Sequence, residues 1–309
     1  MPDLGKTVPS RSKHAYCIIA HKDLYTLNSL IKCIDHPRND IFILIDKKST
    51  LHSANIHQPE ESNMTIISGP AIYWGDISLL DAELMLFHKA SESNEYMYYH
   101  LISGQDLPVN SQSYIHEFCD NVKTGTNFLG YDHGSECDRQ IASRTTYYIP
   151  FTKYLKTEDC LKTRVYNRLR ENITRIQKKL GIRRHKSGIV FKKGCEWASM
   201  TDEFVRYILS QKENLKKTFR GVPCCDELYK QTLAWNSKFK DTIYDLNDEY
   251  MGCLRQIDWK RGNPYTYTEK DEDILIASDR FFARKFDSAQ DRRIIDIITS
   301  NLVHKHKGC

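Results

Sequence analysis

The first hundred residues alternate between continuous apolar runs and segments whose apolar residues recur every three or four positions. Short continuous apolar runs are typical of strands covered on both faces, whereas the wider spacing is typical of amphipathic helices. Strands that alternate with helices form parallel, doubly wound sheets. We therefore predict an α/β fold with a mostly parallel, Rossmann-like central sheet flanked by helices. The pattern predicts strands at 15–20, 41–45, 65–67 and 96–102 and helices at 24–34 and 77–87.

The residues that follow each predicted strand are the first candidates for chemistry. In an open parallel sheet, ligands bind beyond the carboxyl ends of the strands. His21 follows the first strand, Asp46 follows the second, and a turn at 103–106 follows the fourth. We expect these positions to line the functional edge of the sheet.

The middle of the chain carries a weaker pattern, and regular spacing returns after Trp197. One helix is predicted to follow Trp197, and another is predicted to begin near Asp226. A short apolar strand at 274–276 and a helix at 292–302 close the chain. Because no repeat, low-complexity tract or convincing linker divides the sequence, we predict one composite domain over residues 1–309.

Residues 162–186 form a basic stretch with helical spacing. Its apolar residues on one face are Leu169, Ile173, Ile176 and Leu180. The cationic face suits nucleic acid or anionic lipid, but a solvated charged face of an amphipathic helix is the interpretation that we prefer.

Composition narrows the class of protein. The 309 residues include 45 Lys and Arg against 40 Asp and Glu, a formal net charge of +5 that permits an anionic partner but does not require one. No apolar run approaches the ~20 residues that span a bilayer, and the polar start of the chain lacks the apolar centre of a signal peptide. The ten cysteines form no C-x-x-C pair, so we expect reduced, mostly buried thiols and a cytoplasmic protein.

Several common catalytic motifs are absent from the sequence. It contains no G-x-G-x-x-G after the first predicted strand, no Walker A motif, no G-x-S-x-G and no H-E-x-x-H. One string, Asp271-Glu272-Asp273, resembles the paired carboxylates that hold a divalent ion against a diphosphate. Its surroundings favour a turn or a helix cap, so we expect no metal and no cofactor.

Two short strings carry the strongest candidate chemistry. Asp226 and Glu227 follow Pro223, an arrangement that suits the first turn of a helix. We interpret Asp226 as a helix cap, which leaves Glu227 as a candidate general base. Arg284 and Lys285 lie among aromatic residues. Both a surface pair that covers apolar residues with its aliphatic stems and a phosphate clamp fit that second string.

Seven strings of the sequence resemble the core-2/I-branching β-1,6-N-acetylglucosaminyltransferase family (glycosyltransferase family 14), which also includes the peptide O-xylosyltransferases. Each string is weakly specific, but all seven occur in the family's order between residues 14 and 287. The resemblance implies a GT-A-like fold and an inverting, metal-independent transfer of a sugar from a UDP-sugar. The strings are HAYCIIAHKDLYTLNSLI, NDIFILIDKKS, IYWGDISLLDAEL, YYHLISGQDLPV, KGCEWASMTDEFVRYIL, PCCDEL and ILIASDRFFARKFD.

The resemblance assigns the donor to the first part of the chain, with residues 14–110 as the nucleotide-binding half. Ala20 and His21 at the end of the first strand, and Asp46 at the end of the second, fall where the family holds uridine. Trp74 falls at an aromatic position that packs on the nucleotide.

The resemblance places catalysis and diphosphate binding in residues 190–290. Glu227 matches the family's catalytic base, here with Cys225 where a proline is usual. Lys285 matches a lysine that binds the diphosphate in place of a metal. Inversion requires the acceptor oxygen to attack opposite the departing UDP, so a base and a fixed positive charge suffice for this chemistry.

One departure from the family's pattern concerns a second diphosphate-binding cation. The family often has an arginine some two dozen positions before the lysine, where this sequence has Gly262 or Tyr265. We expect Lys260, Arg261 or Arg284 to supply the missing charge. Acceptor contacts are assigned by region alone, to Asp106, Arg139, Arg144 and Trp197.

The sequence therefore predicts a UDP-sugar-dependent glycosyltransferase that uses N-acetylglucosamine or xylose and a glycan or lipid-linked glycan acceptor. Without an anchor and stem it resembles a bacterial member of surface-polysaccharide synthesis, cytoplasmic or peripheral at the inner membrane face. The alternatives are a non-catalytic protein of the same fold that binds a nucleotide sugar or carbohydrate, and a nucleic-acid-binding protein that uses residues 162–186. No nucleic-acid partner is expected.

Overall fold

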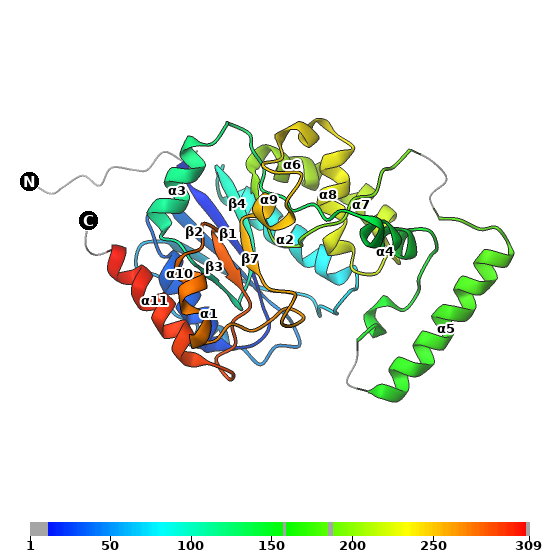
Figure 1. Ribbon diagram of the computed structural model, residues 1–309, viewed down its shortest axis with the longest axis horizontal. Helices are drawn as coiled ribbons and strands as arrows, with labels where there is room; N and C mark the ends of the chain where they lie inside the picture. Colours follow the sequence, from blue (N-terminus) through cyan, green and yellow to red (C-terminus); the bar gives the residue numbers. More distant parts are fainter. Residues whose placement is uncertain (1–11, 157–158, 185–187, 307–309) are drawn as a thin grey trace, which may run out of the picture.

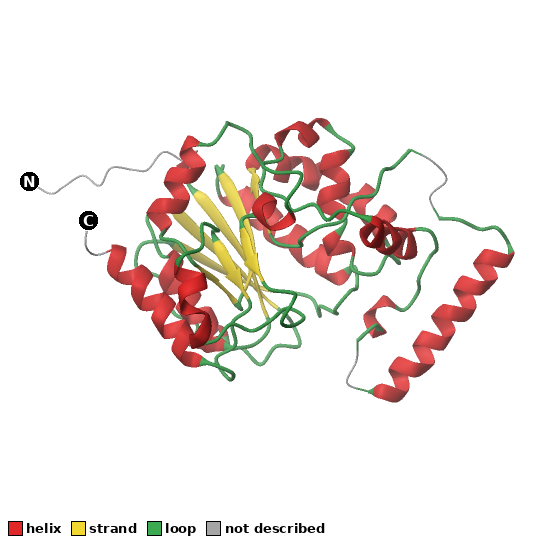
Figure 2. Ribbon diagram, in the orientation of Figure 1, coloured by secondary structure: helices red, strands yellow, loops and turns green. Residues whose placement is uncertain are grey.

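A five-stranded sheet with helices on both faces forms the centre of the molecule (Figures 1 and 2). The computed structural model describes residues 12–156, 159–184 and 188–306. The strand order is β3-β2-β1-β4-β6, and all neighbours are parallel except β4 and β6, which are antiparallel. The predicted mostly parallel sheet is confirmed, and the architecture is GT-A-like. Its strands are β1 (His14–Ala20), β2 (Asn39–Ile45), β3 (Asn63–Ser68), β4 (Tyr98–Ser103) and β6 (Ala198–Thr201).

Helices connect these strands and extend beyond them. The predicted helices at 24–34, at 77–87 and after Trp197 correspond to α1, α2 and α6. The α-helices are α1 (Leu24–Ile34), α2 (Ser78–Ser93), α3 (Gln112–Asn121), α4 (Ser135–Thr145), α5 (Cys160–Lys179), α6 (Asp202–Ser210), α7 (Lys212–Phe219), α8 (Tyr229–Trp235), α9 (Glu249–Cys253), α10 (Glu272–Ile276) and α11 (Arg292–His306). The 3-10 helices are η2 (Ser53–Asn55), η3 (Thr152–Tyr154), η4 (Cys225–Glu227), η5 (Lys238–Thr242) and η6 (Glu269–Asp271).

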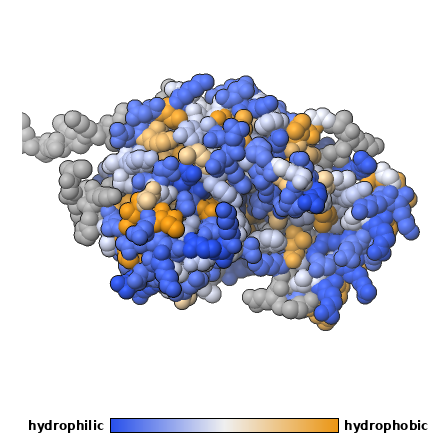
Figure 3. All heavy atoms as spheres, viewed as in Figure 1, coloured by the Kyte–Doolittle hydropathy of each residue, from blue (hydrophilic) through white to orange (hydrophobic). Residues whose placement is uncertain are grey.

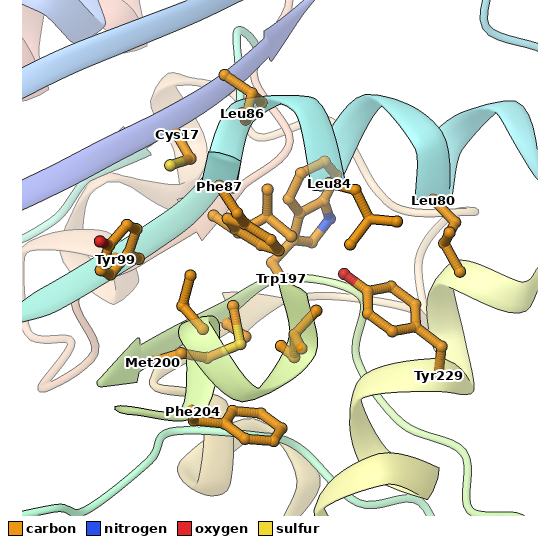
Figure 4. Close-up of a cluster of buried hydrophobic side chains, with 14 of the residues drawn as sticks. Cys17, Leu80, Leu84, Leu86, Phe87, Tyr99, Trp197, Met200, Phe204 and Tyr229 are labelled. Carbon is orange, nitrogen blue, oxygen red and sulfur yellow. The ribbon is translucent and has the colours of Figure 1, made fainter. Parts of the chain in front are cut away.

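The apolar run of β1 serves two separate cores. Successive side chains of a strand point to opposite faces. The odd-numbered positions from Ala15 to Ile19 pack with α2, α6 and α8, and the even-numbered positions from Tyr16 to Ala20 pack with α1, α3 and α11. Figure 4 shows the first core, where Tyr229 of α8 faces α2. Both faces of β1 are therefore buried, as its uninterrupted apolar sequence predicts.

A second, three-stranded sheet brings the C-terminal part of the chain to the end of β4. It has the order β5-β8-β7, with β5 antiparallel and β7 parallel to β8. The register places Asp106 of β5 opposite Arg284 of β8. Two strings that are far apart in the sequence thus meet at the functional edge. The strands are β5 (Asp106–Pro108), β7 (Arg255–Ile257) and β8 (Phe282–Arg284).

The structure corrects two sequence expectations. The predicted strand at 274–276 is helix α10, because Thr268 and Asp271 form a capping box that starts a helical turn and Leu275 alone of the apolar trio is buried. The basic stretch forms helix α5, which ends at Lys179, and residues 185–187 of that stretch lie outside the described residues. The antiparallel strand β6 was not predicted, because its four residues are too short to show an alternation.

Two further properties of the described residues concern their helices and their cysteines. None of their helices is long and apolar enough to cross a bilayer. Eight of their cysteines are free, buried thiols, and burial raises the pKa of such groups as Cys33, to about 12. Buried thiols of this kind are poor nucleophiles because the thiolate is disfavoured.

Candidate active site

The carboxyl ends of β1 and β2 form the first wall of the candidate site. Ala20, the last residue of β1, is buried, and its carbonyl accepts a hydrogen bond from the Asp46 N–H at 3.0 Å. The Asp46 carboxylate accepts further bonds from the N–H groups of Lys48 (2.9 Å) and Ile72 (3.2 Å). His21 follows directly and is exposed. The three predicted uridine contacts therefore lie together at one sheet edge.

Lys285 lies next to this edge, just after β8. Its backbone is held on both sides, since its N–H donates to the Tyr265 carbonyl (3.4 Å) and its carbonyl accepts from Tyr267 (2.9 Å). Partial burial, followed by the charges of Lys22 and Arg284, lowers the pKa of Lys285, and Lys156 acts in the same sense. A group of like charges that weaken one another in this way favours an anionic ligand among them.

Arg284 is the most firmly held of these cations. Its Nη1 donates to Oδ1 of Asp106 at 2.6 Å and to the Ser103 hydroxyl, and its guanidinium lies 4.6 Å from the ring centre of Trp197. Asp106 is 1% exposed and Trp197 6%, and Trp197 packs beside Phe87 in the core (Figure 4). Asp106 and Trp197, which the sequence analysis assigned to the acceptor, therefore contact Arg284 from the protein interior in this structure.

Arg261 has two carboxylate partners. Its Nε lies 2.5 Å from Asp258 and its Nη1 lies 2.6 Å from Asp271. Asp271 also belongs to the capping box with Thr268, which confirms the interpretation of this acidic string as a cap. Among residues 12–156, 159–184 and 188–306, no three His, Cys, Asp or Glu side chains are grouped to hold a metal ion. A donor contact by Arg261 stays a prediction.

Trp74 and Gly75 lie between the cationic group around Lys285 and the turn that precedes Glu227. Trp74 is 60% exposed, and the Lys156 ammonium lies 5.7 Å from its ring centre. Gly75 has φ +71°, and a Cβ there would lie 3.0 Å from Leu155 and 3.2 Å from Sγ of Cys224. The Gly75 carbonyl accepts a hydrogen bond from the Cys224 N–H at 2.9 Å. The backbone next to the exposed Trp74 is thus held against the turn that carries the candidate base.

Glu227 lies in η4, directly after that turn. Cys224 has left-handed backbone angles (φ 48°, ψ 50°), a conformation that is costly for a residue other than glycine and is common at functional sites. Oε2 of Glu227 forms an ion pair with Nη1 of Arg144 at 2.6 Å, and both side chains are partly exposed. The Glu227 carbonyl accepts from the N–H of Gly194 at 3.0 Å. The carboxylate is therefore oriented and still reachable by a substrate.

Asp226 is not a helix cap, which corrects the sequence interpretation. No side chain caps η4, and Asp226 points into the protein, 5% exposed, with no hydrogen-bond partner for Oδ1 among the described residues. Burial, followed by the charges of Glu227 and Glu83, raises its pKa to about 7. Lys230 binds Glu83 at 2.7 Å and the Asp226 carbonyl at 3.1 Å. The buried Lys230–Glu83 pair therefore contacts the turn of Glu227 from the protein interior.

Glu196 is a functional candidate that the sequence reasoning missed. Burial, followed by the charges of Asp226 and Glu83, raises its pKa well above the ordinary value, while Arg284 acts in the opposite sense. Glu196 therefore lies within electrostatic reach of both the Glu227 turn and the cationic group. Its place beside Trp197 in the family-like string KGCEWASM was the signal available in the sequence.

The sequence matches the family model for the Core-2/I-Branching enzyme over residues 14–284. The chain belongs to this family. The chain is also similar to xylosyltransferase 2 from Pan troglodytes and from Homo sapiens. Each is 24% identical over 314 aligned positions, which cover 93% of this chain and 33% of the relative. A further relative, xylosyltransferase sqv-6 of Caenorhabditis briggsae, is 29% identical over 122 positions, which cover 33% of this chain and 15% of that protein.

This Core-2/I-Branching family chain spans about a third of the length of the xylosyltransferase 2 relatives. The relatives therefore inform the region around the site rather than a whole protein. Within that region lie Glu227, Lys285's neighbour Arg284 and Glu196.

Three further charged groups, Asp132, Lys193 and Glu249, interact with one another near Glu227. Lys193 binds Asp132 at 2.9 Å. Burial would lower the pKa of Lys193, but the hydrogen bond to Asp132 and the charge of Glu227 together raise it. Burial, followed by the Asp132 charge, raises the pKa of Glu249 to about 7. Sequence reasoning missed these three residues, because they come from separate loops and from α9.

The two arginines of α4 differ in environment. Arg144, in the last turn, reaches Glu227, whereas Arg139 is exposed and pairs with Glu136 of the same helix at 2.5 Å. The structure therefore brings Arg144 to the candidate base and leaves Arg139 at the surface. An acceptor contact by Arg139 stays a prediction.

Proposed function

We propose that this chain is an inverting, metal-independent glycosyltransferase that moves a sugar from a UDP-sugar to a hydroxyl group of a glycan. The observation that supports the proposal is a chain of contacts between the two groups: Lys156 lies over Trp74, and Gly75 after it is hydrogen-bonded to the turn of Glu227, whose carboxylate is partly exposed. Membership of the Core-2/I-Branching family supports the reaction class.

On the donor side, uridine would occupy the edge formed by Ala20, His21 and Asp46, with Trp74 against the nucleotide. Lys285 would bind the diphosphate, and Arg284 would contribute a charge that Asp106 holds in place. Positive groups fixed before the reaction stabilise the charge that develops on departing UDP without reorganising. These cations supply what a bound divalent ion supplies in other enzymes, so none is required.

On the acceptor side, Glu227 would accept the proton of the attacking hydroxyl. The acceptor oxygen forms a bond to the anomeric carbon as the bond from that carbon to the diphosphate oxygen breaks. The electron pair leaves with UDP, and the acceptor proton ends on the Glu227 carboxylate. General-base assistance of this kind contributes ~10²–10⁴ in rate. Arg144 orients the carboxylate and must yield space to the acceptor.

For the donor sugar we propose xylose or N-acetylglucosamine, and the names of the relatives make xylose the first to test. For the acceptor we propose a glycan or lipid-linked glycan of a bacterial surface polysaccharide, made at the cytoplasmic side of the membrane. Nucleic acid is not a substrate in this proposal.

A panel of nucleotide sugars in EDTA tests the proposed function. UDP-xylose, UDP-N-acetylglucosamine and UDP-glucose are compared with GDP-mannose for thermal stabilisation of the chain and for release of the nucleoside diphosphate. We expect stabilisation and slow hydrolysis with at least one UDP-sugar. Stabilisation without any turnover, even with added glycan acceptors, would support the non-catalytic alternative. The absence of stabilisation by every UDP-sugar would contradict the proposal.

A further inference from the structure

Helix α5 projects from the body of the molecule at the end far from α11 (Figure 1). One of its faces is attached to the segment before it. Nη1 of Arg170 donates to the Phe151 carbonyl at 3.0 Å, and the Gln177 side chain exchanges hydrogen bonds with the Tyr148 backbone at 3.0 and 2.9 Å. Tyr166, on the same face, stacks on a tyrosine of η3. The attachment is polar and aromatic, and it uses only this face.

The apolar residues of α5 point mostly away from this attachment. The sequence predicted one apolar face that included Leu169, Ile173, Ile176 and Leu180, but Ile173 alone of these is half-buried. The exposed ones have spacings of four and seven, so they lie on one side of the helix. We call this set the apolar stripe: Leu161 (70% exposed), Val165 (51%), Leu169 (40%), Ile176 (55%) and Leu180 (66%).

Basic side chains border the apolar stripe along the edge away from the attached face. They are exposed, and helical spacing places them in a row: Arg164, Arg168, Arg175 and Lys179. In all, the twenty residues of α5 contain seven Lys and Arg (CLKTRVYNRLRENITRIQKK) and one carboxylate, Glu171. Figure 3 accordingly shows a predominantly hydrophilic surface over α5, with apolar atoms at its margin.

This combination identifies the partner by its chemistry. Scattered exposed apolar residues are ordinary, but a continuous stripe beside a row of cations is the pattern of a helix that lies in a membrane interface. Nucleic acid would use the cations and leave the five large aliphatic side chains in water. A second copy of this chain would bring seven like charges against seven. An anionic bilayer matches both the stripe and the charge.

We propose that α5 lies flat on an anionic lipid bilayer, with the apolar stripe among the outer acyl segments and the arginine row among the head groups. The helix is ~30 Å long, which suffices for such contact along its whole length. This inference goes beyond the proposed function and does not depend on it, because a bilayer would bind α5 whatever reaction the chain performs.

The position of α5 relates this surface to the candidate site. A groove of about 520 Å³ between α5 and the body is lined by Ile149, Arg170 and Pro223, among others, and Arg175 of the arginine row borders it. Pro223 precedes the turn that carries Glu227, and Leu155, which also lines the groove, packs near Gly75 beside Trp74. Because the apolar stripe faces away from this groove, a bilayer bound to the stripe would lie about one helix diameter (~10 Å) from the groove, on the other side of α5. The candidate site would then be held near a membrane surface that presents a lipid-linked glycan.

Vesicle co-sedimentation of the full chain tests the proposal. The chain is mixed with vesicles of phosphatidylethanolamine and phosphatidylglycerol, or with vesicles of phosphatidylcholine alone, at low and high salt. We expect binding to the anionic vesicles that weakens with salt, and little binding to the neutral ones. Failure to bind anionic vesicles at low salt would overturn the proposal.

Two variants separate the contributions of the stripe and the row. Val165→Ser/Leu169→Ser/Ile176→Ser removes apolar area at exposed positions, so the fold should be kept. Arg164→Glu/Arg168→Glu/Arg175→Glu reverses three charges. We expect each to weaken vesicle binding by at least roughly tenfold.

The matched control reverses three exposed cations on α1, α2 and α11, namely Lys32→Glu/Lys89→Glu/Arg293→Glu. It has the same net charge as the arginine-row variant, and it should bind vesicles as the wild type does or lose much less affinity. Equal loss in both would show attraction by net charge alone and would overturn the role of α5.

Two further outcomes would identify another occupant and overturn the proposal. One is self-association of the wild type in analytical ultracentrifugation that the stripe variant abolishes while vesicle binding persists. The other is tight binding of single-stranded or duplex nucleic acid in place of vesicles. Release of UDP from a soluble UDP-sugar should be the same in all α5 variants, so failure of the proposed function is distinguishable from failure of this inference.

Discussion

The proposed donor side and the proposed acceptor side of the candidate site are built differently. Donor-side groups stand on strand ends and buried turns: Asp46 is held by two backbone N–H groups, and Arg284 is held by Asp106 and Trp197. On the proposed acceptor side, Glu227 pairs with Arg144 of α4, and the nearby Lys193 and Asp132 pair with each other. The donor side is a fixed cationic surface, whereas the acceptor side presents an ion pair that a substrate must separate.

This difference suggests a division of work. Fixed charge suits a diphosphate, whose chemistry is the same for every UDP-sugar. An ion pair that can separate suits an acceptor hydroxyl, because the hydroxyl must reach the Glu227 carboxylate and Arg144 must move aside to allow it. Donor affinity and turnover should therefore respond to different residues.

Glu227→Gln should have the largest effect. The amide keeps the size of the side chain but cannot accept the proton, so we expect turnover to fall by ~10²–10⁴. UDP affinity, measured by calorimetry, should stay within about twofold of the wild type because no donor contact is lost. Near-full turnover would exclude Glu227 as the base.

Lys285→Ala should act on the opposite side. Loss of a charged donor to the diphosphate is expected to weaken UDP binding by roughly 10- to 100-fold. Lys270→Ala, at an exposed lysine of η6, is the control and should leave the affinity unchanged. An unchanged affinity in Lys285→Ala would remove this lysine from the donor site.

Arg144→Ala should lower kcat by roughly tenfold, because the Glu227 carboxylate loses the partner that orients it. UDP affinity should not change, and Arg144→Lys should recover part of the loss. Arg139→Ala, on the same helix but at the surface, is the matched control. A fall in UDP affinity for Arg144→Ala would break the separation between the two sides.

Asp226→Asn tests how much the ionisation of the buried Asp226 carboxyl, next to Glu227, lowers the stability of the fold. The folded pKa of about 7 lies above the ordinary value of 3.8, so between these pH values the unfolded chain has released a proton that the folded chain retains. Stability from this group is therefore lost as pH rises from about 4 to about 7. Asparagine removes that loss and should stabilise the fold above pH 7 by on the order of 1 kcal/mol.

Thermal melts of both proteins from pH 4 to pH 8 measure this effect. We expect the melting temperatures to be similar near pH 4 and to separate by a few degrees by pH 7. A gap that is the same at every pH would show that ionisation of Asp226 is not its cause.

The strand ends of the proposed donor side are the part of the structure that the sequence predicts well. The alternating apolar runs predicted β1 and β2, and the rule for parallel sheets then placed His21 and Asp46 at one edge. Periodicity is informative there because both faces of each strand are buried along its length. It predicted nothing of how Lys22 and Lys156 approach Lys285, since that approach depends on turns between distant strings.

The acceptor side was largely hidden from sequence reasoning. Arg144 was placed there by region only, and Asp132, Lys193 and Glu249 were missed because contacts between loops leave no periodic signal. Asp226 was misread as a cap: its position after a proline fits a helix start, but tertiary packing turns the side chain inward. Local propensity yields to burial at such a point.

The central claim is that side-chain cations, with Lys285 foremost, bind the diphosphate without a metal ion. Calorimetric titration of UDP into the chain in EDTA, repeated after exchange into excess Mn²⁺, tests it most directly. The account predicts binding in EDTA with a Kd that Mn²⁺ changes by no more than about twofold. Binding that occurs only with Mn²⁺, or becomes more than tenfold tighter with it, would contradict the account.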